Sequence, residues 1–162
     1  MSGGAEFRRG VRLGIDWGAA RVGVAACDAE GLLAYPLETV AARDQDAALA
    51  RVAALADEHD PLEIVMGWPL NLDGRAGLAA QSVHEVAVRL AAVVRMPIRL
   101  VDERLSSAQV NHQRSDLDTR RRRIIVDRAA AAGILESALS YERHTGTPPG
   151  QLVDNPWTKG EA

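Results

Sequence analysis

The sequence predicts an α/β domain built on a mixed five-stranded sheet with helices on both faces. Residues 11–40 contain three short apolar segments separated by glycine-containing turns, which is typical of an antiparallel meander. From residue 44 onward, helical segments alternate with short apolar strands, which is typical of parallel strands joined by right-handed crossovers. The predicted order βββαβαβαα therefore places antiparallel and parallel pairs in one sheet.

The meander is predicted from its turns and from the alternation of its residues. We expect strands at 11–16, 21–27 and 32–40. Residues 18–20 form the first turn, and Gly31 lies in the second. In the second strand larger apolar residues alternate with smaller ones, as in a strand whose two faces differ.

The first crossover follows the meander directly. A helix is predicted over 44–59, because Asp44 can cap it and apolar residues recur along it. Pro61 separates this helix from a short buried strand at 62–67. A loop rich in proline, asparagine and glycine follows at 68–74.

The second half of the chain repeats this pattern and ends in helices. A long helix is predicted from about 76 to 95, and Pro97 ends it. A strand at 98–103 follows, and one of two serines can cap a helix over 106–114. The last long helix is predicted over 122–142.

The composition is that of an ordinary globular domain. The 162 residues are 47% hydrophobic and 25% charged, which suits one domain with its own core. We expect this domain to span 11–142, between a glycine-rich segment at 1–10 and a proline- and glycine-containing tail at 143–162, both loosely packed. Cys27 is the only cysteine, which excludes a disulfide framework and a cysteine-rich zinc ribbon.

The hydropathy of the sequence predicts the cellular location of the protein. No apolar run reaches the roughly 18–20 residues that a transmembrane helix needs. The N-terminus also lacks the apolar region of a signal peptide. We therefore predict a cytoplasmic protein that does not enter a membrane.

Basic residues are concentrated in one part of a chain whose overall charge is weakly negative. The net charge of −3 argues against a histone-like protein that wraps DNA. Residues 114–128, however, hold six arginines and three aspartates, a local net charge of +3. Such a segment is either the solvated start of a helix or a surface that follows phosphates. The arginines that we predict to contact nucleic acid here are Arg114, Arg120, Arg121, Arg122 and Arg123.

Three carboxylates are candidates for one shared site. Asp16 closes the first predicted strand and Glu103 closes the fifth. Ligand sites of open α/β sheets lie beyond the carboxyl ends of parallel strands, although acids there also serve as simple caps. Asp127 gives the sharper signal, because it lies near the centre of the apolar stripe of the last helix. A carboxylate on a buried face is costly unless a partner or a cation stabilises it.

This set of ligands points to a hard divalent cation. Oxygen ligands suit Mg²⁺ or Mn²⁺, whereas the four histidines show no metal-binding spacing. Metal-assisted phosphoryl transfer uses such a cluster, with metals that activate a water and stabilise the leaving oxygen of a phosphodiester. We therefore predict Asp16, Glu103 and Asp127 as catalytic metal ligands.

The loop at 67–77 joins a strand to a helix and has two interpretations. Its glycines allow a close backbone approach, and a helix N-terminus can accept a phosphate. A structural turn uses the same residue types. On the first interpretation, Asn71, Asp73 and Arg75 contact nucleic acid. Trp17 and Trp68 also follow strands near this edge, where packing at the rim is the main expectation and stacking on an unpaired base the alternative.

Taken together, these segments resemble the YqgF family, small bacterial proteins described as Holliday-junction-resolvase-like or as nucleases that mature pre-16S ribosomal RNA. The resemblance covers about residues 11–141. The motifs that carry it are Gly-Ile-Asp-Trp-Gly at 14–18, Arg-Val-Gly-Val-Ala at 21–25, the loop at 67–77, Val-Asp-Glu-Arg-Leu-Ser-Ser at 101–107 and Val-Asp-Arg-Ala-Ala at 126–130 followed by Ile134 and Leu135. Trp17 and Ser107 are minor departures from the family's usual residues.

The resemblance implies an RNase H-like fold and divalent-metal-dependent cleavage of structured nucleic acid. It places Asp16, Glu103 and Asp127 as metal-binding catalytic acids, in agreement with the separate argument from the residues. Arg21 and Arg104 lie within two of the family's motifs, and we add them to the residues predicted to contact nucleic acid.

The leading hypothesis is an endonuclease that acts in the 5′ maturation of pre-16S rRNA, as a monomer or a homodimer. Two alternatives stay open: a Holliday junction resolvase acting on four-way DNA, and a non-catalytic RNA-binding module of ribosome assembly. An actin-like or sugar-kinase ATPase shares the Asp-x-Gly strand at 16–18 but needs two such domains, for which this chain is too short.

Overall fold

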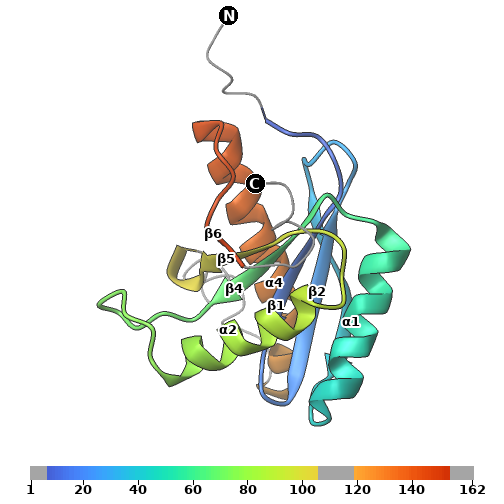
Figure 1. The fold of residues 1–162 in the computed structure, drawn as a ribbon, viewed down its shortest axis with the longest axis vertical. Helices are drawn as coiled ribbons and strands as arrows, with labels where there is room; N and C mark the ends of the chain where they lie inside the picture. Colours follow the sequence, from blue (N-terminus) through green and yellow to red (C-terminus); the bar gives the residue numbers. More distant parts are fainter. Residues whose placement is uncertain (1–6, 106–118, 154–162) are drawn as a thin grey trace, which may run out of the picture.

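The computed structural model describes residues 7–105 and 119–153, apart from the side chains of residues 105 and 119–128. Within these residues, one mixed sheet of six strands has the order β3-β2-β1-β4-β5-β6 (Figure 1). The strands are β1 (Arg12–Trp17), β2 (Arg21–Cys27), β3 (Ala34–Ala41), β4 (Glu63–Trp68), β5 (Ile98–Asp102) and β6 (Gln151–Leu152). The described helices are α1 (Gln45–His59), α2 (Leu78–Ala91) and α4 (Thr119–Thr145), with a 3-10 turn, η1 (Glu103–Leu105).

Pairing within the sheet confirms the predicted mixture of strand directions. β1 and β3 lie antiparallel to β2, whereas β1, β4 and β5 run parallel. The prediction of five strands is wrong by one, because β6 lies antiparallel to β5 in the register Leu100↔Gln151. β6 has only two residues, both exposed, so no alternation in the sequence reveals it. Val153 is buried directly after it, so this part of the tail packs against the domain.

The helices begin and end close to their predicted positions. Asp44 caps α1 as predicted, since its side chain accepts the N–H of Ala47 at 3.1 Å. α2 is shorter than the predicted 76–95, and α4 extends beyond the predicted 122–142 at both ends. The helix predicted at 106–114 lies outside the described residues.

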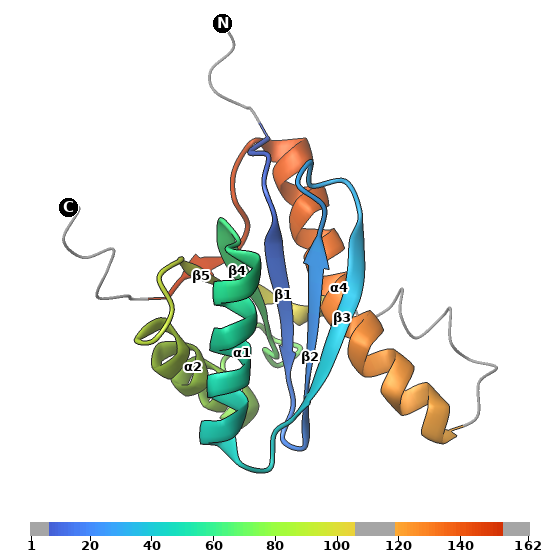
Figure 2. The same ribbon diagram turned by 90° about the vertical axis from the view of Figure 1, so that its right-hand side faces the viewer.

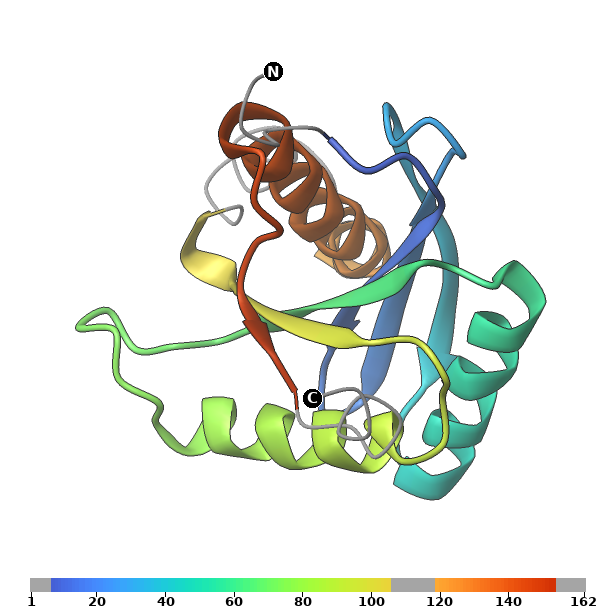
Figure 3. The ribbon, with the colours of Figure 1, turned by 45° about the horizontal axis from the view of Figure 1, so that its top comes forward.

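Helices cover both faces of the sheet, as predicted. α1 and α2 lie on one face and α4 on the other (Figures 2 and 3). The larger core lies under α1 and α2, and the smaller one lies between the sheet and α4. Gly14 permits the closest approach of α4, because a Cβ atom there would lie 2.8 Å from the carbonyl oxygen of Ala131. α4 therefore rests almost directly on the backbone of β1.

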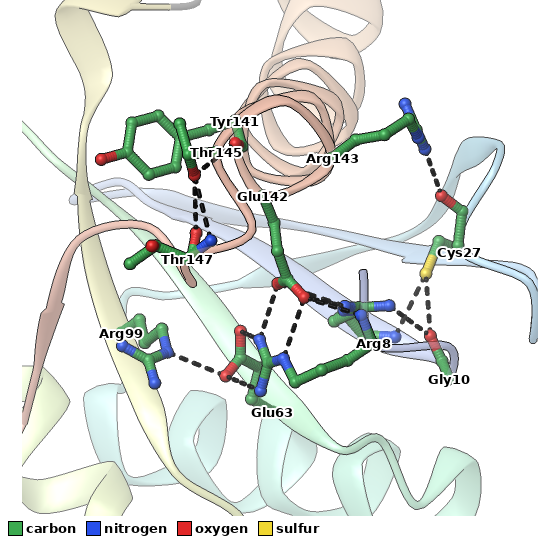
Figure 4. A network of polar contacts seen from close by, with 12 residues as sticks. Arg8, Gly10, Cys27, Glu63, Arg99, Tyr141, Glu142, Arg143, Thr145 and Thr147 are labelled. Carbon is green, nitrogen blue, oxygen red and sulfur yellow. Dashed lines mark hydrogen bonds and ion pairs between the residues drawn. The ribbon is translucent and has the colours of Figure 1, made fainter. Parts of the chain in front are cut away.

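A network of buried charges anchors the C-terminal part of α4 at the end of the sheet where β1 and β4 begin (Figure 4). Glu142 of α4 accepts hydrogen bonds from the guanidinium groups of Arg8, at 2.7 Å, and Arg12, at 3.3 Å. Glu63 accepts further ones from Arg8 and Arg99, each at 2.9 Å. Arg12, Glu63 and Glu142 are all at least 98% buried. Arg8 thus ties a segment that the sequence predicts to be loosely packed to both α4 and the sheet.

Cys27 is buried in the core under α4, and its sulfur accepts the backbone N–H of Arg12 at 3.2 Å. Among the residues that the structure describes, no helix is long and apolar enough to cross a bilayer.

Candidate active site

Two of the three predicted acids come to the same edge of the sheet. Asp16 is the last residue but one of β1, and Glu103 directly follows β5. β4 runs between them, parallel to both, with Ile15 beside Met66 and Val101 beside Gly67. The carboxyl ends of these three parallel strands therefore meet at one edge, where open α/β sheets bind their ligands.

Both acids lie on the face that α4 covers. Leu13 and Ile15 belong to the core under α1 and α2, so alternation along β1 turns Asp16 toward the α4 face. Glu103 reaches the same face over Gly67. A Cβ atom on Gly67 would lie 2.9 Å from Cγ of Glu103 and 2.6 Å from Cδ1 of Ile134. The missing side chain of Gly67 therefore makes the space in which Glu103 packs against α4.

The third acid, Asp127, lies in α4, about one helical turn before Ala131. The buried residues of the described part of α4 include Ala131, Ile134, Leu135 and Ala138, which confirms the apolar stripe on which Asp127 was placed by its spacing. Its own side chain is outside the described part of the structure, so its meeting with Asp16 and Glu103 stays a prediction. Among the described side chains alone, no group of three His, Cys, Asp or Glu residues is placed to hold a metal.

Arg104 connects this edge to the loop at 69–77. Its guanidinium donates to both carboxylate oxygens of Asp102 and to the carbonyl oxygens of Leu72, at 2.9 Å, and Asn71, at 3.3 Å. The hydrogen bonds from Arg104 lower the pKa of Asp102 despite its partial burial. The residue that follows Glu103 thus holds the loop in place beside η1, where the loop projects from the domain (Figure 1).

The loop itself is an ordered turn with an exposed polar tip. The N–H of Asn71 donates to the carbonyl of Arg75, and that of Gly74 donates to the carbonyl of Asn71. Gly74 has a φ of 85°, a conformation that favours glycine. The side chains of Asn71, Asp73 and Arg75 are exposed. Turn chemistry accounts for these contacts, and contact with a phosphate stays a prediction.

The remaining predicted basic residues lie around the same edge or outside the described side chains. Arg21 begins β2 and, by alternation with the buried Val22, lies on the same face as Asp16, which pairs with Gly23. Arg114 lies outside the described residues. The first turns of α4 contain Arg120, Arg121, Arg122 and Arg123, whose side chains are not described.

The two tryptophans pack on the opposite face. Trp17 and Trp68 both lie against the core under α1 and α2. The indole N–H of Trp68 donates to the carbonyl of Ala80 at 3.0 Å, which fixes this ring at the rim of α2. Both rings therefore pack at the rim, as mainly expected from the sequence, and stacking of a base on either ring stays a prediction.

Sequence reasoning missed Asp102 and Gly67. Successive residues of 101–104 point to opposite faces, so the sequence does not place Asp102 beside Glu103 in the carboxylate cluster. The only local signal for Asp102 is Arg104, two residues later, whose guanidinium donates to its carboxylate. In the sequence, Gly67 is only one of several loop glycines, because its role depends on Ile134 and Glu103 packing over it.

The chain is similar to known proteins along most of its length. Residues 10–141 match the family model RuvX, described as Holliday junction resolvase. A relative from Streptomyces coelicolor, named as a candidate pre-16S rRNA nuclease, is 43% identical over 93% of this chain and 92% of its own length. A relative from Nocardioides sp. with the same name is 47% identical over 91% of this chain and 99% of its own.

A solved structure shows the same fold. RuvC of T. thermophilus, determined in complex with a Holliday junction substrate, is 20% identical, with a TM-score of 0.53, covering 86% of this chain and 99% of RuvC. The fold is therefore RNase H-like, as the family resemblance implied. With this fold, the matched model and relatives above 40% identity along most of their length, the chain belongs to the RuvX (YqgF) family of nucleases.

Proposed function

We propose that this protein is a divalent-metal-dependent endonuclease whose catalytic acids are Asp16, Glu103 and Asp127. The observation that carries the proposal is the placement of Asp16 and Glu103 on one face of one sheet edge, under the helix that contains Asp127. Acids that gather in this way repel one another, and a cation bound between them relieves that repulsion.

The residues fit a hard cation. Gly67 leaves room for the Glu103 carboxylate beside the strand that carries Asp16, and carboxylate oxygens are the ligands that Mg²⁺ and Mn²⁺ prefer. Bound by Asp16, Glu103 and Asp127, such a cation would supply charge neutralisation at the phosphodiester and a more acidic attacking water.

The surroundings of the acids can hold the nucleic-acid backbone. Arg21 lies on the face of Asp16, and the loop at 69–77 is braced against the residue after Glu103. Arg120, Arg121, Arg122 and Arg123 add positive charge in the first turns of α4, the helix that contains Asp127. Arginine forms bidentate contacts with phosphate, so these groups would orient the strand while the carboxylates act on it.

We infer that the substrate is the 5′ region of pre-16S rRNA, which the protein would process in the cytoplasm. The names of the relatives support RNA, whereas the description of the family model supports a four-way DNA junction. A homodimer would suit the two-fold symmetry of a junction, and a monomer suffices for a single RNA end.

The test is a cleavage assay with Mn²⁺ that offers a pre-16S rRNA fragment and a Holliday junction side by side. Asp16→Asn and Asp127→Asn should each lower the cleavage rate on the order of 10²–10³-fold, the scale seen when one preorganised electrostatic group is removed. Asp57→Asn, an exposed acid of α1 on the opposite face, is the matched control and should cleave like wild type. Wild-type rates in the Asp16 and Asp127 variants would refute the assignment.

A further inference from the structure

A cavity lies on the side of the sheet edge that faces away from α4. Its volume is about 510 Å³, within the roughly 300–1,000 Å³ of small-molecule sites. It opens between the turn after β1, the start of α1 and the first half of α2. The residues that shape it include Trp17, Ala42, Arg43, Pro69, Ser82 and Val86.

The polar groups of this cavity point to a ligand with an aromatic ring and a negative charge. Trp17 contributes an aromatic ring to the wall. Within the described part of the chain, its indole N–H has no hydrogen-bond acceptor, in contrast to that of Trp68. Arg43 is exposed and is the one charged side chain among the described residues of the lining, and it forms no ion pair with another of them or with any other described residue. Among the described residues that line the cavity, none carries a carboxylate that would oppose an anion.

The cavity also lies close to the proposed catalytic edge. Trp17 directly follows Asp16 in β1, and successive residues of a strand point to opposite faces. The hydrogen bond from the N–H of Ala42 to the carbonyl of Ala20 brings the end of β3, and with it Arg43, to the turn after β1. A strand whose phosphate lies at Asp16 therefore needs only to pass over the end of β1 to reach the cavity.

We propose that this cavity binds an unpaired nucleotide of the substrate strand, close to the bond to be cut. The base stacks on Trp17, and Arg43 pairs with the adjoining phosphate. Stacking on an aromatic side chain tolerates any base, so the cavity reads the unpaired state rather than the sequence. The inference rests on the proposed nuclease function and adds to it a preference for substrates with single-stranded nucleotides beside a duplex.

The test measures binding without cleavage. Labelled RNA hairpins of one duplex sequence, either blunt or with a single-stranded extension, are titrated with the full-length protein in EDTA, and fluorescence anisotropy gives the Kd. Wild type should bind the extended hairpin about tenfold more tightly, the scale of one or two stacked bases. Ser82→Trp, which fills the cavity from an exposed position of α2, and Arg43→Ala should each abolish this preference while binding to the blunt hairpin stays within about twofold.

Two matched control variants carry the same kinds of substitution at positions outside the cavity. Val88→Trp places a tryptophan on an exposed position of α2 that does not line the cavity, and Arg95→Ala removes an exposed arginine beyond the other end of α2. Both controls should keep the preference. Thermal unfolding of all four variants confirms that they are folded.

The outcomes separate this inference from the proposed function. Equal binding of both hairpins by wild type, or a preference that survives both Ser82→Trp and Arg43→Ala, would overturn the cavity assignment. Free adenosine or uridine monophosphate that competes at a concentration equal to the Kd of the extended hairpin would overturn it too, because the cavity would then bind a free nucleotide. Asp16→Asn should keep the binding preference, so a wild-type protein that shows the preference but never cleaves would refute the nuclease and leave the cavity assignment standing.

Discussion

The two ends of the sheet face under α4 differ in how deeply their charged side chains are buried. Where β1 and β4 begin, Glu63 and Glu142 are buried together with the guanidinium groups that neutralise them. At the other end, Asp16 and Glu103 are only half-buried and come together from two strands, under a helix that brings a third acid. Buried ion pairs fix the charges of the first end, whereas the second brings two half-buried acids to an edge that solvent reaches. This difference separates the part of the face that holds α4 from the part that we propose to be catalytic.

The largest expected effect comes from breaking the paired end. Glu142→Ala leaves Arg12, which is 99% buried, without its carboxylate partner. Removing one member of a buried ion pair costs about 3–5 kcal/mol, because the remaining charge stays desolvated. Urea unfolding followed by circular dichroism should show this loss. Glu136→Ala, at an exposed position of the same helix, should change the unfolding free energy by less than about 0.5 kcal/mol. Equal losses in the two variants would contradict the proposed anchoring role.

Low pH should weaken the ion pairs of Glu142 at the same end of the sheet. Burial raises the pKa of Glu142, but hydrogen bonds from the side chain and backbone of Arg8 outweigh this and lower the pKa from 4.5 to about 2. A carboxylate with a depressed pKa in the folded state contributes stability that is present above the unfolded value of 4.5 and is lost as the pH falls toward 2. The contribution is on the order of 3 kcal/mol.

The measurement is the pH dependence of the unfolding free energy in wild type and in Glu142→Gln. The two curves should lie furthest apart above pH 5 and approach each other as the pH falls, since the variant has no carboxylate to protonate at this position. A constant gap between the curves down to pH 2 would show that Glu142 does not titrate in this way.

The contrast between the ends also separates what the sequence could predict from what it could not. The positions of Asp16 and Glu103 follow from strand ends, because parallel strands must finish at one edge. The paired end gives no local signal, because Arg8 meets Glu142 across a separation of 134 residues and Glu63 across 55. β6 is too short for any periodicity, and Gly67 shows its role only when Ile134 and Glu103 lie over it. Local patterns therefore predicted which strand-end acids share one edge, and long-range packing decided what supports them.

Gly67→Ala should affect the acidic end in both stability and activity. The new Cβ atom would lie 2.6 Å from Cδ1 of Ile134 and 2.9 Å from Cγ of Glu103, so one of them must move. Overpacking of this kind costs about 1–3 kcal/mol, measurable by urea unfolding. The double variant Gly67→Ala with Ile134→Val removes the Cδ1 atom and should recover part of the stability. Its cleavage rate should stay low, because the contact with Glu103 remains, and full recovery of the rate would show that Glu103 needs no space from Gly67.

The smallest effect on stability is expected at the ion pair of the acidic end. Arg104 and Asp102 are partly exposed, and such pairs contribute about 0–1 kcal/mol, so Arg104→Ala should leave the unfolding free energy nearly unchanged. Its effect should appear in the loop at 69–77, since only the planar guanidinium reaches Asp102 and the carbonyl oxygens of Asn71 and Leu72 together. Hydrogen exchange at 71–75 should therefore increase in Arg104→Ala and equally in Arg104→Lys. Arg75→Ala, whose side chain lies 3.9 Å from Asp73 in an exposed pair, is the control and should leave that exchange unchanged. Wild-type exchange in Arg104→Ala would contradict this role in positioning the loop, and wild-type exchange in Arg104→Lys alone would show that a positive charge without the planar guanidinium is enough to hold it.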